Sequence, residues 1–448
     1  MPREILLNAF DMACVGHIQQ GMWTHPRDTA TSYNRIEHWT GLARLLERGL
    51  FDGLFLADVL GVYDVLDGRP DGAIRAAAQV PLLDPALVVP AMAAVTQHLS
   101  FGITANLSYE APYLLARRFS TLDHLTGGRI GWNIVTGYLD SAARGMGLDR
   151  QMRHDDRYDL ADEYMEVVYR LWEQSWEEGA VRADRAAGVY ADPARVRRVR
   201  HEGRQFRLDA IHLCEPSPQR TPVLWQAGAS DRGRRFAATH AECVFLNGGP
   251  PEVLAPQIAA LRAATPRPIR VFVGATLVIG SSDADAAGKL ADYRRHASVE
   301  GALAHAAASL GIDFNAYGED EPIGGSGNAI QSNVALMRSV AGGTLTRRGL
   351  VDQFILGSRQ RPWTGTASSL ADRMVAYAEA TGCDGFNLSR TVIPECLEDV
   401  VDRLVPALQE RGAYKRAYRP GTAREKLLGG GRLLEAPHPA ALLRAGSS

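Results

Sequence analysis

The stretch TPVLWQAGASDRGRRFAATHAE, residues 221–242, contains the unit from which the fold is built. A short apolar run, Pro222 to Trp225, leads through small residues directly into a helical pattern. Such a run is typical of a parallel strand that is buried on both faces. The small residues fit two interpretations: a tightly packed turn, or a seat for an anion, since free N–H groups and a serine hydroxyl at a helix N-terminus bind phosphate.

Eight segments of this strand type alternate with longer amphipathic stretches. The strand candidates are residues 5–10, 52–58, 101–108, 129–136, 223–228, 243–248, 271–279 and 385–389. The helical stretch that follows the fourth candidate has its apolar side chains on one face, at positions 161, 164, 165, 168, 171 and 172. Because crossovers between parallel strands are right-handed, we predict an α/β fold, a TIM (β/α)8 barrel.

Three connections are longer than the ~2–6 residues that join strands and helices in a minimal barrel. We expect a single barrel domain over residues 1–428, with insertions at about 59–84, 177–220 and 281–365, and a loose C-terminal tail at 429–448. Insertions of this length form lids, binding loops or oligomer contacts, or they are surface decoration without a function.

Composition restricts the function. The chain of 448 residues is 46% hydrophobic and has a formal net charge of −2, which gives no electrostatic case for binding nucleic acid or an anionic membrane. Its five cysteines include no C-x-x-C pair, which argues against a disulfide framework or a zinc site. The first residues lack a signal-peptide pattern, and no apolar run approaches the ~20 residues that span a bilayer. We expect a soluble, cytoplasmic protein.

Polar residues gather where the strand candidates end. In a TIM barrel the active site lies at the carboxyl ends of the strands, so these residues form one rim. They are Asp11, Cys14, His17, Asp58, Tyr63, Gln79, Thr104, Asn106, Thr136, Tyr138, His154, Tyr158, Gly228 and Ser230. The sequence shows no set of ligands with metal spacing, no G-x-S-x-G elbow and no P-loop. The rim therefore predicts a site that holds a ligand rather than a metal or a serine nucleophile.

Several long stretches resemble the bacterial-luciferase-like flavin monooxygenases. They are NAFDMACVGHIQQGMWTHP (8–26), FDGLFLADVLGVYDV (51–65), STLDHLTGGRIGWNIVT (120–136), HDDRYDLADEYMEVVYRLWEQSWEE (154–178), the stretch 212–245 and GCDGFNL (382–388). The resemblance covers nearly all of 5–250 and resumes at 365–428, whereas 281–365 match poorly. Within the family, the pattern is similar to the branch of nitrilotriacetate, dibenzothiophene-sulfone and long-chain alkane monooxygenases, and most similar to the alkane enzymes.

The resemblance implies a two-component homodimeric monooxygenase. A separate NAD(P)H:flavin reductase would supply reduced FMN, which reacts with O2 through a flavin peroxide and oxygenates an organic substrate. By position in the family pattern, the flavin-ring residues are Asp58, Thr104, Asn106 and Thr136, and the phosphate residues are His154, Tyr158, Ala227, Gly228 and Ser230. In the same way, the catalytic residues are His17, Cys14 and Tyr138, and the substrate residues are Tyr63 and Gln79.

Several of these assignments have a simpler alternative. Gly228 and Ser230 fit a helix N-cap without a ligand, and His154 with Tyr158 fits a helix cap and a core aromatic. Asp58 can be interpreted as a cap at a strand end, and Cys14 as an inert buried side chain. His305 lies in the poorly matching insertion and can be interpreted as a residue on a helix surface.

One departure from the family pattern bears on the chemistry. Where the alkane enzymes have VTSH, this chain has VTGY, so Gly137 and Tyr138 replace a serine and a histidine. As a proton donor Tyr138 is weaker, with a pKa of about 10. The rim offers no cluster of cations, which suits a largely apolar substrate such as a long-chain alkane or an aromatic or sulfur heterocycle. A deazaflavin-dependent oxidoreductase and a non-catalytic flavin carrier are the alternatives on this barrel.

Overall fold

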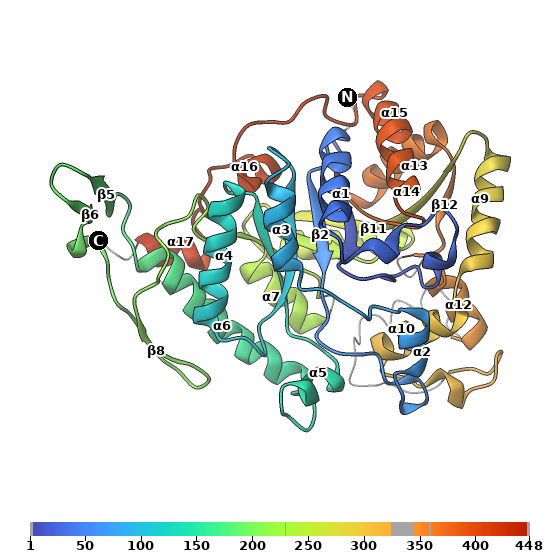
Figure 1. Ribbon diagram of the computed structural model, residues 1–448, viewed down its shortest axis with the longest axis horizontal. Coiled ribbons are helices and arrows are strands. Elements are labelled where there is room, and N and C mark those ends of the chain that lie inside the picture. The colour runs from blue at the N-terminus through green and yellow to red at the C-terminus, as the bar shows by residue number, and fades with distance from the viewer. Residues whose placement is uncertain (1–2, 229, 324–344, 358–359, 446–448) are drawn as a thin grey trace.

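The computed structural model describes residues 3–228, 230–323, 345–357 and 360–445 (Figure 1). Eight parallel strands lie in the order β10–β9–β4–β3–β2–β1–β13–β11, and pairing of β10 with β11 closes the barrel. The strands are β1 (Leu6–Met12), β2 (Gly53–Ala57), β3 (Ser100–Asn106), β4 (Ile130–Val135), β9 (Val223–Gln226), β10 (Cys243–Leu246), β11 (Arg270–Gly280) and β13 (Gly385–Ser389). The predicted TIM barrel and its eight strand segments are confirmed.

Helices surround the barrel because each lays an apolar face on the strands. Those that follow barrel strands include α1 (Ile36–Arg48), α3 (Pro85–Ala93), α4 (Pro112–Thr126), α6 (His154–Gln174), α7 (Asp231–His240), α8 (Pro251–Ala263) and α13 (Ala367–Thr381). All six apolar positions noted in the α6 sequence are buried. Tyr164 and Trp172 of α6 pack around Trp132 of β4, which joins the helix to the barrel core.

The first and third insertions pack on each other. Their elements are α2 (Asp71–Ala76) in the first, and α9 (Asp283–His296), α10 (Val299–Leu310), α12 (Arg347–Phe354) and β12 (Trp363–Thr366) in the third. Together they bury Tyr63, Ala73, Leu303 and Phe354 in an apolar cluster of their own. In Figure 1, α2 and α10 lie together beside the end of the barrel toward which the β2 arrow points, so the two insertions flank the carboxyl ends of the strands.

The second insertion forms two antiparallel hairpins. They consist of β5 (Val181–Asp184) with β6 (Val189–Ala191), and β7 (Val199–Glu202) with β8 (Arg207–Ala210). Figure 1 shows the β5–β6 hairpin projecting away from the barrel. This insertion therefore extends the molecule on the side away from α10.

The C-terminal segment differs from the expected loose tail. Helix α17 (Pro439–Ala445) packs along α6, and His438 just before it is buried, with Nε2 3.0 Å from the carbonyl oxygen of His240. Upstream, α16 (Ala423–Leu428) closes the amino end of the barrel, where Ala423 and Leu427 pack with the first residues of the strands. The apolar pattern of PAALL at 439–443 is the sequence signal for this docking. No described helix is long and apolar enough to cross a membrane.

Candidate active site

Two adjoining cavities lie at the carboxyl ends of the barrel strands. Counted with the solvent in their open mouths, their volumes are about 1080 and 1020 Å³. Asp58, Thr104, Tyr138 and Ala227 line both cavities, so the two form one continuous site. Each is large enough for a small organic ligand.

The two ends of this site differ in chemistry. We call one the arginine end, which the starts of α6 and α7 line with His154, Arg157, Tyr158, Gly228 and Ser230. We call the other the tyrosine end, which is lined by Phe10, His17, Tyr63, Gln79, Tyr138, Phe245, Leu246 and His305. The rim residues expected to bind a cofactor line the arginine end or its junction with the tyrosine end, and the two expected substrate residues line the tyrosine end.

The turn after β9 accounts for two of the small residues, Gly228 and Ser230. A side chain on Gly228 would place its Cβ 2.2 Å from Gln226 Nε2 and 2.7 Å from the Tyr158 hydroxyl oxygen, so a larger residue here would displace these two side chains. Ser230 caps α7, because its Oγ accepts a hydrogen bond from Gly233 N at 3.1 Å. Ser230 is therefore the helix N-cap of α7. The positive end of the α7 dipole nevertheless points into the same cavity that Ser230 lines.

His154 and Tyr158 lie one turn apart at the start of α6, as their spacing predicts. Their ring centroids are 5.2 Å apart, and His154 Nε2 lies 3.3 Å from Ser230 Oγ. Burial raises the pKa of Tyr158, so the phenol stays protonated and can donate a hydrogen bond. Three hydrogen-bonding side chains from two helix starts thus meet at one point.

Arg157 adds a buried cation to this end of the site. The side chain is only 3% exposed, and its Nη1 donates to the Gly137 carbonyl oxygen at 2.6 Å. Its Nε is buried without a hydrogen-bond partner, and no carboxylate oxygen of the described residues lies within 4.0 Å of the guanidinium. Burial lowers the pKa of Arg157, since desolvation disfavours the charged form. A buried cation without a counter-ion is costly, which indicates that this end of the site is built for an anion.

Two amide side chains and a threonine shape the junction between the two ends. Thr104 Oγ1 accepts a hydrogen bond from Asn133 Nδ2 at 2.8 Å, and Asn106 Oδ1 accepts one from Ser108 N at 2.8 Å. Thr136 also lines the cavity here, and its carbonyl oxygen accepts a hydrogen bond from Ser108 Oγ. These bonds fix the orientation of Thr104 and Asn106 without a ligand.

Asp58 occupies the same junction as a carboxyl with a perturbed pKa. Burial, opposed by a hydrogen bond from the Val59 backbone, raises the pKa of Asp58 to about 7. The folded protein therefore binds the proton more tightly than the unfolded chain does, and its stability falls as pH rises from about 4 to about 7. Asp58→Asn removes this dependence. We expect the unliganded variant to be more stable than the wild type by about 1–3 kcal/mol at pH 8.5, with little difference at pH 4.

Melting temperatures of both proteins across this pH range check the Asp58 prediction. A stability difference that does not change with pH would contradict the assigned pKa of Asp58.

A chain of hydrogen bonds runs along the wall of the tyrosine end. Gln79 Nε2 donates to the His17 carbonyl oxygen at 2.8 Å, and the Tyr63 hydroxyl donates to Gln79 Oε1 at 2.5 Å. The Tyr138 and Tyr63 hydroxyl oxygens are 3.2 Å apart. The Tyr63 ring stacks on His305 of α10, with centroids 5.5 Å apart and planes 8° from parallel. Segments from β1, the first insertion, β4 and the third insertion thus meet in this wall.

Cys14 does not fit the expected catalytic role. Its side chain is 1% exposed and lines neither cavity, and burial raises the pKa of its thiol well above the ordinary value. A thiol that stays protonated is a poor nucleophile. The alternative, an inert buried side chain, is therefore the better interpretation of Cys14. His17, in contrast, lines the tyrosine end. Its ring packs edge-on against the Phe10 ring, with the two ring centroids 4.5 Å apart.

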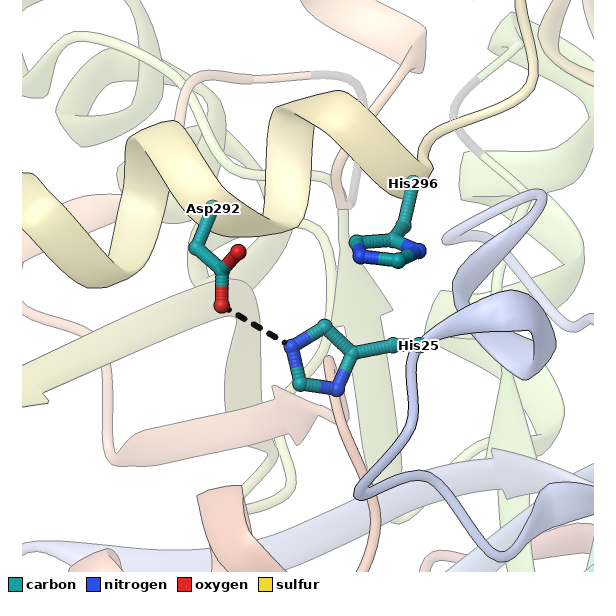
Figure 2. A group of neighbouring side chains, drawn as sticks. All are labelled: His25, Asp292 and His296. Carbon is teal, nitrogen blue, oxygen red and sulfur yellow. Dashed lines mark hydrogen bonds and ion pairs between the residues drawn. The ribbon is translucent and has the colours of Figure 1, made fainter.

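A second cluster of titratable side chains joins the loop after β1 to α9 (Figure 2). His25 Nε2 lies 3.1 Å from Asp292 Oδ2, and the His25 and His296 rings are 4.8 Å apart. The backbone N–H of Arg27 donates to His25 Nδ1 at 3.3 Å, so the proton of a neutral His25 ring is on Nε2, which donates to Asp292. In this tautomer Nε2 has no lone pair for a metal ion. We interpret the cluster as a clamp that holds the loop after β1 against α9.

Comparison with known proteins places the chain in a family. Residues 14–384 match the luciferase-like monooxygenase family. The chain belongs to this family. It is 44% identical to dimethyl-sulfide monooxygenase of Hyphomicrobium sulfonivorans, over 99% of this chain and 94% of the relative. It is also 44% identical to long-chain alkane monooxygenase of Geobacillus thermodenitrificans (strain NG80-2), over 96% of each chain. A crystal structure of long-chain alkane monooxygenase has a TM-score of 0.92 at 43% identity, and the match covers 99% of this chain and 100% of that one.

Membership of the luciferase-like monooxygenase family confirms the resemblance, the fold and the class of enzyme. The named relatives favour a monooxygenase over the deazaflavin alternative. Among the residues that line the site of this luciferase-like monooxygenase, Arg157, Gln226 and His305 were missed from sequence. For His305 a signal existed, because α10 is apolar on every side and such a helix is buried.

Proposed function

We propose that this luciferase-like monooxygenase binds reduced FMN and uses O2 to oxygenate a largely apolar organic molecule. The observation that carries the proposal is Arg157, a buried cation that no carboxylate of the described residues pairs with, at one end of a continuous cavity whose other end is mostly aromatic and aliphatic. A ligand with an anionic tail and a planar body fits this division. FMN has both parts, and its phosphate matches the donors of the arginine end.

The arginine end would hold the phosphate through several donors. Arg157, Tyr158, His154 and Ser230 supply side-chain groups, and the start of α7 supplies its dipole. Each hydrogen bond to a charged group contributes roughly 1.5–3 kcal/mol net, so these donors together would account for much of the affinity. Gly228 would contribute by leaving open the space that a side chain would fill.

The flavin ring would lie at the junction, beside Asp58, Thr104, Asn106 and Thr136. Bound there, the reduced flavin supplies the electrons that activate O2. The protein's own contribution is to orient the substrate next to the ring and to exclude water. His17, Tyr63, Gln79 and Tyr138 border the space left for the substrate, with the packed first and third insertions as its wall. The described lining of the tyrosine end contains no arginine or lysine, which disfavours a polycarboxylate substrate.

The remaining components follow from the family and from the surface. A separate NAD(P)H:flavin reductase would supply the reduced FMN. Diffusion of free reduced FMN from the reductase to this protein would be sufficient for the transfer. We also propose a homodimer in the cytoplasm. The projecting β5–β6 hairpin of the second insertion supports the dimer, because a two-stranded hairpin is only marginally stable in water without further contacts.

Isotope labelling tests the proposed reaction. The protein, FMN, NADH and a flavin reductase are incubated under ¹⁸O2 with a panel of alkanes, thioethers and sulfur heterocycles. The proposal predicts one ¹⁸O atom per product molecule from at least one class, dependent on FMN. Release of hydrogen peroxide alone with every class, or a preference for a deazaflavin over FMN, would contradict it.

A further inference from the structure

A third cavity opens beside the two that form the site. We call it the side cavity; it lies between β3 and the starts of α3 and α4, and its volume is about 1160 Å³ counted with the solvent in its open mouth. Asp84, Leu114 and Met146 line it and are exposed, so its outer part reaches the surface of the protein. Asp58 and Thr104 line its inner part, where it meets the site.

Asp58 lies where all three cavities meet. Among the described residues, only Asp58 and Thr104 line the arginine end, the tyrosine end and the side cavity alike. The hydroxyl of Thr104 keeps its proton in water, and its oxygen accepts the hydrogen bond from Asn133. Of the two, Asp58 is therefore the group that can release a proton and take one up again.

The side cavity gives Asp58 a path to solvent when the site is filled. In the proposed function FMN occupies the arginine end and the junction, and the substrate occupies the tyrosine end. The side cavity is then left for water. It is polar enough to hold water, since Asp84 and Glu110 line it, the latter paired with Arg118 at 2.8 Å.

The proposed reaction consumes a proton that has to enter the site. Oxidation of the anion of reduced FMN releases two electrons and one proton, whereas O2 takes up two electrons and two protons, whether it ends as oxygenated product and water or as hydrogen peroxide. We propose that Asp58 is the catalytic residue that supplies the missing proton. As the oxygen accepts the electron pair, the carboxyl O–H bond of Asp58 breaks and a new O–H bond forms. Water in the side cavity then returns a proton to the carboxylate.

Other titratable or charged side chains face the same three cavities. Among the described residues they are His154, Arg157 and Tyr158 at the arginine end, His17, Tyr63, Tyr138 and His305 at the tyrosine end, and Asp84, Tyr109, Glu110 and Arg118 in the side cavity, with Cys14 close behind the wall. Because three of them are histidines, a comparison of the wild type with an Asp58 variant is needed to identify the proton donor.

Rapid mixing tests the role of Asp58. The protein, saturated with reduced FMN, is mixed with O2 at pH values from about 5 to about 9 without an organic substrate, and the disappearance of reduced FMN is followed. Because burial raises the pKa of Asp58 to about 7 and the flavin anion favours the neutral acid further, we expect the rate constant to fall at pH values at or above about 7. Asp58→Asn should lower the rate constant at about pH 6 by about 100-fold, as for loss of a general acid, and remove the fall.

Two further variants make the comparison specific. Asp84→Asn is the matched control, since it is the same change in the same cavity, and asparagine preserves the helix cap in which Asp84 Oδ1 accepts a hydrogen bond from Ala86 N at 2.9 Å. It should change the rate constant by less than about 3-fold. Asp58→Glu keeps an acid at the junction and should retain the fall with pH. Saturation with reduced FMN keeps any loss of affinity out of these comparisons.

An infrared titration of the unliganded protein provides a readout that does not depend on turnover. The difference between the spectra of the wild type and Asp58→Asn isolates the C=O band of the protonated Asp58 carboxyl. This band should disappear with a midpoint at about pH 7. A band that is absent at about pH 5, or one that does not titrate up to about pH 9, overturns the inference.

The outcomes separate this inference from the proposed function, on which it rests for the identity of the flavin. A wild-type rate constant that does not change with pH, or equal rate constants in Asp58→Asn and Asp84→Asn, overturns the inference and leaves the proposed function in place. If Asp58→Asn does not fold, Asp58→Ala takes its place in both measurements. Failure of FMN to bind to the wild type, measured by flavin fluorescence, would overturn the proposed function and the inference with it.

Discussion

Arg157→Met is expected to weaken FMN binding by about 100-fold and to leave the unliganded protein about as stable as the wild type. The loss of affinity follows from the removal of a buried cation from the arginine end, where hydrogen bonds to an anion are strongest. The small effect on stability has two opposing parts. The variant loses the 2.6 Å hydrogen bond to the Gly137 carbonyl oxygen but no longer buries a charge without a counter-ion. FMN titration followed by fluorescence and thermal melting measure the two effects.

Arg232→Met is the matched control for this experiment. Arg232 lies near the same site, with its guanidinium 5.5 Å from the Tyr158 ring, but it pairs with Asp159 and Asp162 and lines neither cavity. Its loss should change FMN affinity by less than about 3-fold, because its charge is already neutralised by two carboxylates. Wild-type FMN affinity in Arg157→Met, or an equal loss in both variants, would contradict the assigned role of Arg157.

Arg424→Met is expected to destabilise the protein by about 3–5 kcal/mol. Unlike Arg157, Arg424 has a buried counter-ion: its Nε and Nη2 lie 2.7 and 3.0 Å from the two carboxylate oxygens of Glu242. Nη2 also donates to the carbonyl oxygens of Thr221 and Pro222, just before β9. The variant leaves a buried carboxylate without its partner and loosens the contact between α16 and the amino end of the barrel.

A double variant separates the charge effect from the packing effect. Arg424→Met with Glu242→Gln should recover part of the lost stability, because the uncompensated charge is removed. Chemical denaturation of the three proteins gives the comparison. A loss below about 1 kcal/mol in Arg424→Met would contradict the role of this ion pair in closing the barrel.

Much of the architecture could be predicted from sequence because it depends on local patterns. Eight apolar runs separated by amphipathic stretches are enough for a closed parallel barrel, and strand ends locate the rim without further information. Rim residues such as Asp58 and Ser230 were found for this reason. The family pattern added their expected partners in the helix that begins at His154.

Other features depend on tertiary contacts that leave little trace in the sequence. Arg157 lies among charged residues in the first turn of α6, a pattern typical of a solvated helix face. In the structure its side chain instead lines the cavity and donates to the Gly137 carbonyl oxygen. The orientation of the Gln79 amide is fixed by the His17 carbonyl of another loop, a contact that no local sequence pattern predicts. The two interpretations of Cys14 could not be separated from sequence, because the family pattern carries no information on burial.

The central claim is that the arginine end binds the phosphate of FMN. Equilibrium dissociation constants of reduced FMN and reduced riboflavin test it most directly, since the two share the ring and differ only in the phosphate. We predict that FMN binds at least about 100-fold more tightly, as two or more charge-assisted hydrogen bonds require. Equal affinity for the two flavins would contradict the claim.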